Sequence, residues 1–247
     1  MKNIRTLLLL CLPLLAISSC DYTSSKVDPS SIDSVDSGGR SSEDVDPYQV
    51  DADIWMEYFD TFDAFYIDKN YSISMHITGE YEPGEYDDWN IELETANYAM
   101  KRISWDTDHP EGKDDPANYY VSSKNKTTPT SFEVDEVRFD ESKGEWACED
   151  SYTIKKEEAV GEYVLPFKKF SSFVYNEETH YYEAEEYTLE FADMVLWGKD
   201  VKFQFYQGKL VKGSMELLSD GDKEDYFYEY EFQFGGIDFK VPKYNKD

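Results

Sequence analysis

The 247-residue chain is strongly acidic, with 53 Asp plus Glu residues against 24 Lys plus Arg and a formal net charge of -29. Phosphate binding depends on neutralisation by basic side chains, so the composition argues against nucleic acid as a partner. Anionic lipid headgroups also repel such a body. Aromatic residues make up 17% of the chain, enough apolar material for one compact domain with a sizeable core.

The N-terminus has the order of an export signal. Two basic residues precede an apolar run over residues 7–17, and a pair of serines follows this run. The run is shorter than the roughly 20 residues that a membrane-spanning helix needs. We therefore predict that residues 1–19 are a signal peptide that is removed.

The end of this signal, Ile17-Ser18-Ser19-Cys20, resembles the lipobox of bacterial lipoproteins. The resemblance implies cleavage before Cys20 and a diacylglyceryl thioether on its sulfur. Each buried methylene contributes about 0.8 kcal/mol, and two acyl chains hold a protein where one chain is marginal. The expected location is the cell envelope, lipid-anchored on the extracytoplasmic side of a bacterial membrane. An ordinary signal peptide with an incidental cysteine is the alternative.

The remaining thiol of the mature chain is Cys148, because Cys11 leaves with the signal and Cys20 carries lipid. The mature protein therefore has no partner for an intramolecular disulfide. No histidine or basic residue next to Cys148 lowers its pKa in the way that reactive thiols require. We expect Cys148 to be a buried small apolar residue.

Residues 20–47 are dominated by Ser and Asp and carry no aromatic residue after Tyr22. Such a segment cannot bury enough apolar surface to offset its ordering entropy. It is predicted to be a flexible tether, which holds a single β-rich domain over residues 48–247 away from the membrane.

A change of periodicity follows the tether. Apolar residues at steps of three and four predict an amphipathic helix from about Asp51 to Tyr66. The apolar stripe is Ile54, Trp55, Tyr58, Phe59, Phe62, Phe65 and Tyr66. We expect this stripe to pack on its own domain, and contact with a ligand or partner is the alternative.

After Asn70 the apolar residues recur at every second position. Residues 201–205 and 211–217 flank a turn at 207–209, and residues 226–234 form a further strand. The predicted fold class is mainly β (α+β). The expected architecture is an antiparallel meander or curved half-barrel sheet with an N-terminal amphipathic helix.

An internal repeat supports successive hairpins. Residues 139–146 and 175–182 lie 36 positions apart and share an aromatic residue, an acidic turn and a second aromatic residue seven positions later. Two copies are too few for a solenoid. The repeat therefore predicts two similar hairpins in one sheet.

These turns, together with the segments 201–211 and 236–242, resemble those of poorly characterised bacterial lipoproteins. Those lipoproteins are grouped with the half-barrel of lipoprotein-carrier and mycobacterial glycolipid-binding proteins. The resemblance covers residues 130–242 and implies an antiparallel sheet wrapped around helices. A shared fold hosts many functions, so it leaves the activity open.

The sequence contains no catalytic signature. His76, His109 and His180 are scattered, and no phosphate loop, nucleophile elbow or zinc motif occurs. We predict no catalytic residue, no metal ligand and no cofactor, and enzymatic activity is left open with a preference against it.

Two acidic clusters are candidates for calcium sites, because oxygen-rich loops can surround a hard cation. The first contains Asp106, Asp108, Glu111, Asp114 and Asp115, and the second contains Asp220, Asp222, Glu224 and Asp225, with Glu231 following. The second lacks the glycine that a calcium-binding loop has at its sixth position, because Asp225 occupies that position. We expect both to be solvated charge runs.

The leading functional hypothesis is a binding module. Its concave face would hold an apolar or amphipathic ligand, or an aromatic outer surface would meet an envelope partner. The alternative is a carbohydrate-binding or carbohydrate-processing surface lipoprotein, because exposed Trp and Tyr stack on sugar rings. A third hypothesis is a structural envelope protein.

Overall fold

The computed structural model describes residues 46–62, 69–82, 85–155, 167–191, 194–219 and 225–246. The predicted signal peptide, Cys20 and all of the tether before Asp46 lie outside these residues. The chain divides into two units, residues 1–45 and 46–247, and the description concerns the second. Within the described ranges, no helix is both long and apolar enough to cross a membrane.

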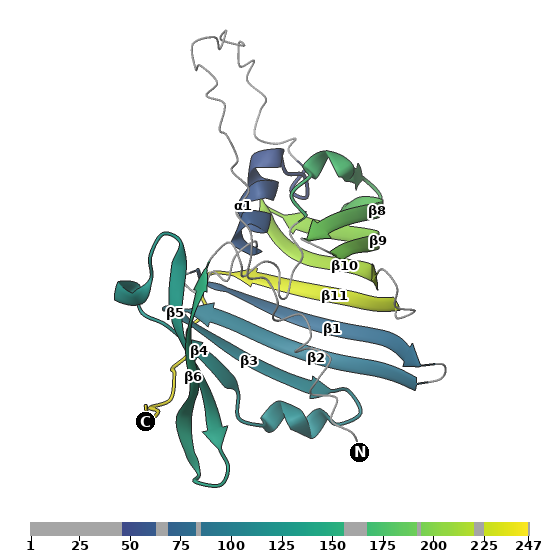
Figure 1. The fold of residues 1–247 in the computed structure, drawn as a ribbon. Coiled ribbons are helices and arrows are strands. Elements are labelled where there is room, and N and C mark those ends of the chain that lie inside the picture. Colours follow the sequence, from purple (N-terminus) through teal and green to yellow (C-terminus); the bar gives the residue numbers. More distant parts are fainter. Residues whose placement is uncertain are drawn as a thin grey trace, which may run out of the picture. The chain divides into compact units, whose positions relative to one another are not determined.

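Eleven antiparallel strands form one sheet in the order β6-β5-β4-β3-β2-β1-β11-β10-β9-β8-β7 (Figure 1). The first six strands are β1 (Tyr71–Glu82), β2 (Glu85–Ala96), β3 (Ala99–Asp106), β4 (Asn118–Val121), β5 (Ser131–Asp140) and β6 (Glu145–Lys155). The others are β7 (Val174–Asn176), β8 (Tyr181–Phe191), β9 (Met194–Tyr206), β10 (Lys209–Ser219) and β11 (Asp225–Phe234). The helices are α1 (Ala52–Phe62) and the short 3₁₀ helices η2 (Pro110–Asp114), η3 (Lys124–Lys126) and η4 (Phe170–Ser172). The prediction of a mainly β, antiparallel chain is confirmed, and the described strands form an open sheet with edges at β6 and β7.

The sheet consists of two meanders that meet in its middle. The chain runs outward from β1 to β6, continues at the opposite edge with β7, and returns inward to β11. β11 then pairs with β1, from Tyr71 opposite Phe234 to Glu80 opposite Asp225. The first and last strands are therefore neighbours at the centre, as the blue and yellow strands of Figure 1 show.

The repeated turns close hairpins at the two edges of the sheet. Asp140 Oδ1 accepts hydrogen bonds from the backbone N–H groups two and three residues later, and Asn176 Oδ1 does the same in the second copy. Each four-residue loop ends in the left-handed region, at Gly144 (φ 69°) or His180 (φ 60°). The expectation of two similar hairpins is confirmed.

α1 begins after Asp51, whose Oδ1 accepts a hydrogen bond of 2.9 Å from the N–H of Ile54. This is a helix N-cap, which satisfies one of the donors that the first turn leaves unpaired. Trp55 and Phe59, four residues apart on one side of the helix, are fully buried. The end of the predicted stripe, Phe65 and Tyr66, lies outside the described residues.

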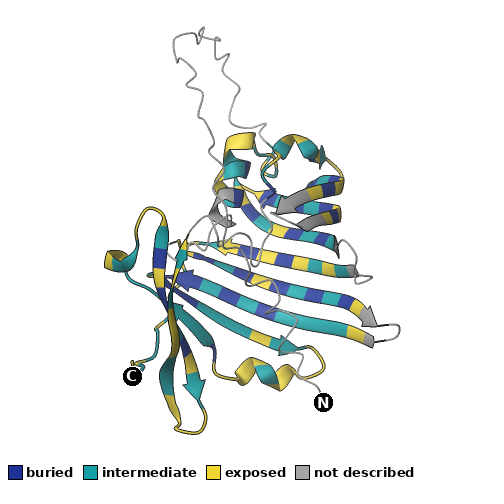
Figure 2. Ribbon diagram, in the orientation of Figure 1, coloured by how far each residue is buried: buried dark blue, intermediate teal, exposed yellow. Residues whose placement is uncertain are grey.

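Burial alternates along the strands, as the bands of Figure 2 show. On β1 the side chains of Tyr71, Ile73, Met75 and Ile77 are buried, while those between them are more exposed. We call the face that carries these four residues the inner face, and the opposite one the outer face. On β9 the inner face carries Val201, Phe203 and Phe205, and all three are fully buried.

Gly213 on β10 leaves room for an aromatic ring on the inner face. It lies opposite Phe203, and a Cβ atom at this position would come within 2.7 Å of two atoms of the Phe203 ring. The ring of Phe203 in turn contacts Phe59 of α1, with centroids 4.9 Å apart. The missing side chain at Gly213 therefore sets how closely α1 packs on the sheet.

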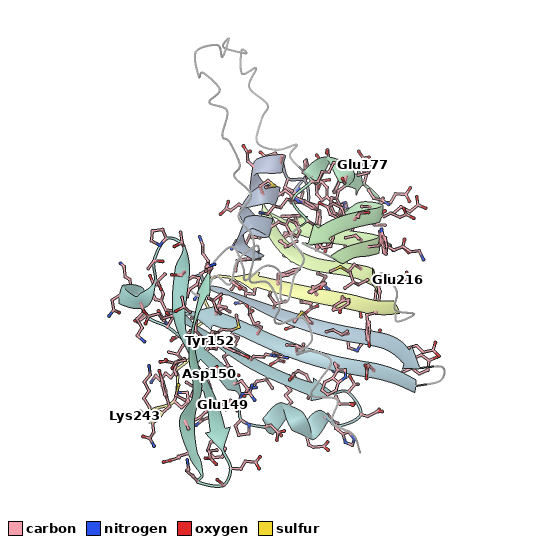
Figure 3. The ribbon with its side chains drawn as sticks, viewed as in Figure 1. Glu149, Asp150, Tyr152, Glu177, Glu216 and Lys243 are labelled. Atoms are coloured by element: carbon pink, nitrogen blue, oxygen red, sulfur yellow. The ribbon has the colours of Figure 1, made fainter. Side chains whose placement is uncertain are left out.

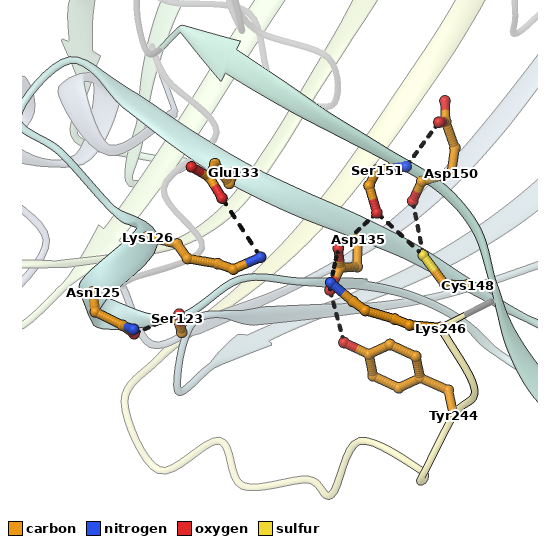
Figure 4. A network of polar contacts seen from close by, with 10 residues as sticks. All are labelled: Ser123, Asn125, Lys126, Glu133, Asp135, Cys148, Asp150, Ser151, Tyr244 and Lys246. Atoms are coloured by element: carbon orange, nitrogen blue, oxygen red, sulfur yellow. Dashed lines mark hydrogen bonds and ion pairs between the residues drawn. The ribbon is translucent and has the colours of Figure 1, made fainter.

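The C-terminal segment covers the β6 edge (Figure 4). The backbone N–H of Cys148 donates to the carbonyl of Asn245 (3.0 Å), which extends the sheet by one bridge. The hydroxyl of Tyr244 and the ammonium group of Lys246 bind the buried carboxylate of Asp135. Burial alone would raise the pKa of Asp135, but hydrogen bonds led by that of Lys246 hold it below its ordinary value.

Gly213→Ala is expected to lower the free energy of unfolding by about 1–3 kcal/mol, because the new methyl group overlaps the Phe203 ring. Urea unfolding followed by tryptophan fluorescence measures this. Ser214→Ala, one residue along on the outer face, is the matched control and should change stability by less than about 0.5 kcal/mol. Equal stability of the two variants would contradict the packing argument.

Candidate functional site

The inner face over β8 and β9 is occupied by α1. Trp55 lies at the centre of an aromatic cluster, and its indole N–H donates to the carbonyl of Phe167 (2.6 Å). The rings within contact distance of Trp55 are those of Phe59, Phe170, Phe173, Tyr182, Phe203 and Phe205. The aromatic stripe thus packs on its own domain, as expected.

The segment before α1 is tied to the same end of the strands. The Tyr182 hydroxyl accepts from the N–H of Val50 (2.6 Å) and donates to the Val50 carbonyl (2.9 Å). The N–H of Gln207, in the β9–β10 turn, donates to the carbonyl of Pro47 (2.6 Å). The Tyr175 hydroxyl donates to Asp46 (2.6 Å), and this bond lowers the pKa of that carboxyl. The chain therefore enters the domain beside the β9–β10 turn.

α1 is too short to cover the whole inner face. Its 11 residues give a length of about 16 Å at roughly 1.5 Å per residue, which equals about three spacings of roughly 4.8 Å between neighbouring strands. Its ring contacts with strands reach β8, β9 and, through Tyr58, Phe234 at the end of β11. The inner face continues across β1 and β2 with Ile73, Met75, Ile91 and Leu93, and these side chains are buried as well. An apolar ligand would therefore reach the inner face by displacing protein from it.

The outer face carries a polar network at the centre of the sheet. His76 Nε2 lies 2.7 Å from Asp88 Oδ1, and Nδ1 lies 3.4 Å from Glu229 Oε2. The Thr107 hydroxyl donates to Asp88 and accepts from the Asn90 amide. The hydrogen bond with Asp88 is the main cause that raises the pKa of His76, and the Thr107 bond is the main cause that lowers the pKa of Asp88. The Thr107 hydroxyl bonds to Asp88 and not to His76. The network therefore does not have the arrangement in which a histidine activates a hydroxyl as a nucleophile.

The outer face carries five large exposed apolar side chains among the described residues, two of which are Val174 on β7 and Tyr206 at the end of β9. The other three are Tyr86 on β2, Trp197 on β9 and Phe227 on β11, with 70%, 37% and 40% of their surface exposed. Carboxylates lie around them and across the rest of the molecule. Figure 3 labels Glu216 on β10, Glu177 in the β7–β8 turn, and Glu149 and Asp150 on β6.

Cys148 differs from its prediction, because it is half-buried and not buried. Its Sγ lies 3.1 Å from the carbonyl oxygen of Asp150 and 3.3 Å from the hydroxyl of Ser151. The physical reason is its place on β6, an edge strand of the sheet, whose outer edge pairs with the C-terminal segment through a single bridge among the described residues.

The predicted acidic clusters do not assemble a metal site in the part of the chain that the structure describes, where no three His, Cys, Asp or Glu side chains converge. In the first cluster, Asp106 Oδ1 accepts from the N–H of Asp108 and so shapes the loop before η2. Of the second cluster, Asp220, Asp222 and Glu224 lie outside the described residues, and only the backbone of Asp225 is described. Glu231 forms an ion pair with Lys212 (3.3 Å).

The three histidines are also separate. His109 lies 3.3 Å from Glu111 in an exposed loop, and His180 closes the β7–β8 turn, where it stacks on Tyr48. The contacts of His76 with two carboxylates were not predicted. Those carboxylates come from β2 and β11, and β11 follows β1 by more than 140 residues in the chain.

The pKa of His76 is expected to lie above 6.5, because two carboxylates favour its charged form. The network should thus contribute stability that is fully present below pH 6.5 and is lost as the pH rises through the raised pKa. NMR titration of the His76 ring measures this, and Asp88→Asn should lower the value. Asp108→Asn, outside the network, is the control. A His76 pKa that is unchanged by Asp88→Asn would contradict the assignment.

Comparison with known proteins is sparse. No protein-family model matches the chain, and no curated protein matches it. Among solved structures, it is similar to a LolA superfamily protein from Nitrosomonas europaea, at 10% sequence identity. The match covers 77% of this chain and 96% of that protein, with a TM-score of 0.28.

Proposed function

We propose that the protein is a membrane-anchored, extracytoplasmic binding module that takes an apolar or amphipathic ligand, such as an acyl chain, onto the inner face of its sheet. The observation that carries the proposal is a wide, apolar, aromatic-lined inner face, part of which is covered by the short helix α1. α1 is the segment that yields its place to the ligand.

The energetics permit this exchange. Burying a large apolar side chain is worth about 1.5–3 kcal/mol, so lifting Trp55 and Phe59 from the sheet costs roughly 3–6 kcal/mol. An acyl chain that buries about ten methylenes contributes roughly 8 kcal/mol, at about 0.8 kcal/mol each. A helix of this length is marginal by itself in water, so α1 depends on its packing contact and is easily exchanged.

The anchor is the second part of the proposal. Removal of Lys2 and Arg5 with the signal changes the net charge from -29 to -31. Because the mature domain is this acidic, anionic lipid headgroups repel it. The thioether on Cys20 is then the main hold on the membrane, and the tether gives the domain its reach.

Cys20→Ser is expected to release the protein from the membrane or leave it unprocessed, because the hydroxyl cannot accept the diacylglyceryl group. Fractionation of cells followed by immunoblotting measures the distribution, and Cys148→Ser is the control that keeps its anchor. Firm membrane retention of the processed Cys20→Ser protein would overturn the anchoring role.

Trp55→Ala and Phe59→Ala are expected to strengthen ligand binding. Each weakens the contact that the ligand must displace, so the apparent affinity for a dansyl-labelled fatty acid should rise roughly tenfold. Met75→Gln, in the wall of the inner face, should lower it. Fluorescence titration and native mass spectrometry of the Cys20→Ser chain give the readout.

Trp197→Ala, on the outer face, is the matched control and should leave the fatty-acid affinity unchanged. Circular dichroism checks that each variant is folded, and the milder Phe59→Leu serves if Trp55→Ala is not. The proposal fails if folded wild-type protein and folded α1 variants alike bind no fatty acid, or if weakening α1 lowers the affinity.

A further inference from the structure

Three exposed aromatic side chains of the outer face lie on alternate strands, at the end of the strands away from Tyr206. Trp197, Phe227 and Tyr86 belong to β9, β11 and β2, and the sheet order across this region is β9-β10-β11-β1-β2. Neighbouring strands are about 4.8 Å apart, so successive rings are separated by about 10 Å across the sheet. We call these three residues the aromatic row.

The strand register places the aromatic row on one face at one end of the strands. A line of directly opposed residues runs from Trp197 to Tyr86, and opposed residues in an antiparallel sheet share a face. The intervening positions are Leu218, Asp225 and Glu80. Phe227 follows Asp225 by two residues along β11, so its side chain is on the same face. It lies two residues closer to the middle of the strands than the line from Trp197 to Tyr86.

Hydrogen-bonding groups lie between the rings. Phe227 is flanked by Glu216 of β10 on one side and Thr78 of β1 on the other, and Thr78 is opposite Asp88. Glu216 is held by Lys199 at 3.3 Å, and Asp88 by His76 at 2.7 Å. The surface therefore alternates apolar rings with carboxylates that accept hydrogen bonds from hydroxyl or ammonium donors.

We infer that the aromatic row binds an extended polysaccharide that is uncharged or carries amino groups, with its chain running across the strands. Sugar rings present apolar faces for stacking on aromatic rings and hydroxyls for bonding to carboxylates, in the alternation seen here. Successive aromatic rings of the row are two strands apart, and this spacing of about 10 Å matches the distance between every second sugar ring of an extended chain. The acidic surroundings exclude an anionic polymer. A protein partner would instead be expected to meet a contiguous apolar patch.

The aromatic row also lies far from the point where the tether joins. Pro47 is bonded to the β9–β10 turn, and Trp197 precedes Tyr206, at that end of β9, by nine residues. At about 3.3 Å per residue the separation is about 30 Å along the strand. Trp197 therefore lies at the opposite end of β9 from the contact with Pro47. This site is on the opposite face from the proposed ligand of the inner face and is independent of it.

The test is cosedimentation of the full lipoprotein, in detergent, with cellulose, chitin and chitosan. Wild-type protein should bind at least one of them. Trp197→Ala, Phe227→Ala and Tyr86→Ala should each weaken binding by roughly tenfold, as expected when an exposed aromatic anchor is truncated. Trp197→Phe should retain most of the affinity, and polygalacturonate, an anionic polymer, should not bind.

Tyr206→Ala is the matched control, because Tyr206 is similarly exposed (44%) but lies at the other end of β9. It should bind as wild type does. The inference is overturned if wild-type protein binds none of the three polysaccharides, or if Tyr206→Ala loses as much affinity as the variants of the row. It is also overturned if the variants of the aromatic row bind the polysaccharide as tightly as wild type does.

Discussion

The pairing of β1 with β11 is the contact on which the whole sheet depends. It joins strands more than 140 residues apart in the chain and makes one sheet from two meanders. The chain-closure entropy for this contact grows only slowly with loop length, and ten opposed pairs repay it. The same pairing brings Glu229 next to His76 and aligns the aromatic row across the centre of the sheet. Without it, neither the inner face nor the outer face would be continuous.

The two faces have different physical characters because the strands alternate with a period of two. The inner face is a layer of aromatic and aliphatic side chains, to which α1 adds Trp55 and Phe59. The outer face carries paired charges, such as Lys199 with Glu216, between isolated exposed rings. A lipid-anchored module with an apolar ligand on one face and a polysaccharide on the other would link an envelope glycan to a lipid or amphipathic molecule near the membrane.

The turns and the start of α1 could be predicted from the sequence, because each depends on hydrogen bonds or backbone preferences within a few residues. The turns that begin with Asp140 and Asn176 form because a side-chain oxygen caps the backbone within three residues, and the Gln207-Gly208 turn uses two residues with positive φ. The start of α1 follows from its Asp51 cap. By contrast, Gly213 beneath Phe203 and the half-buried Cys148 depend on which strands are neighbours, and neither residue carries a local signal for it.

By itself, the sequence determined the mainly β class, the hairpin turns and the amphipathic pattern of α1, and it supplies the prediction of an anchor at Cys20. These features depend on neighbours within a few residues, and so they are encoded in short segments. Only the tertiary structure decided the strand order, the occupation of the inner face by α1, the contacts of His76 and the alignment of Trp197, Phe227 and Tyr86. Each of these joins segments that are distant in the chain, and the pairing is selected by the burial of a whole face, which no local pattern specifies.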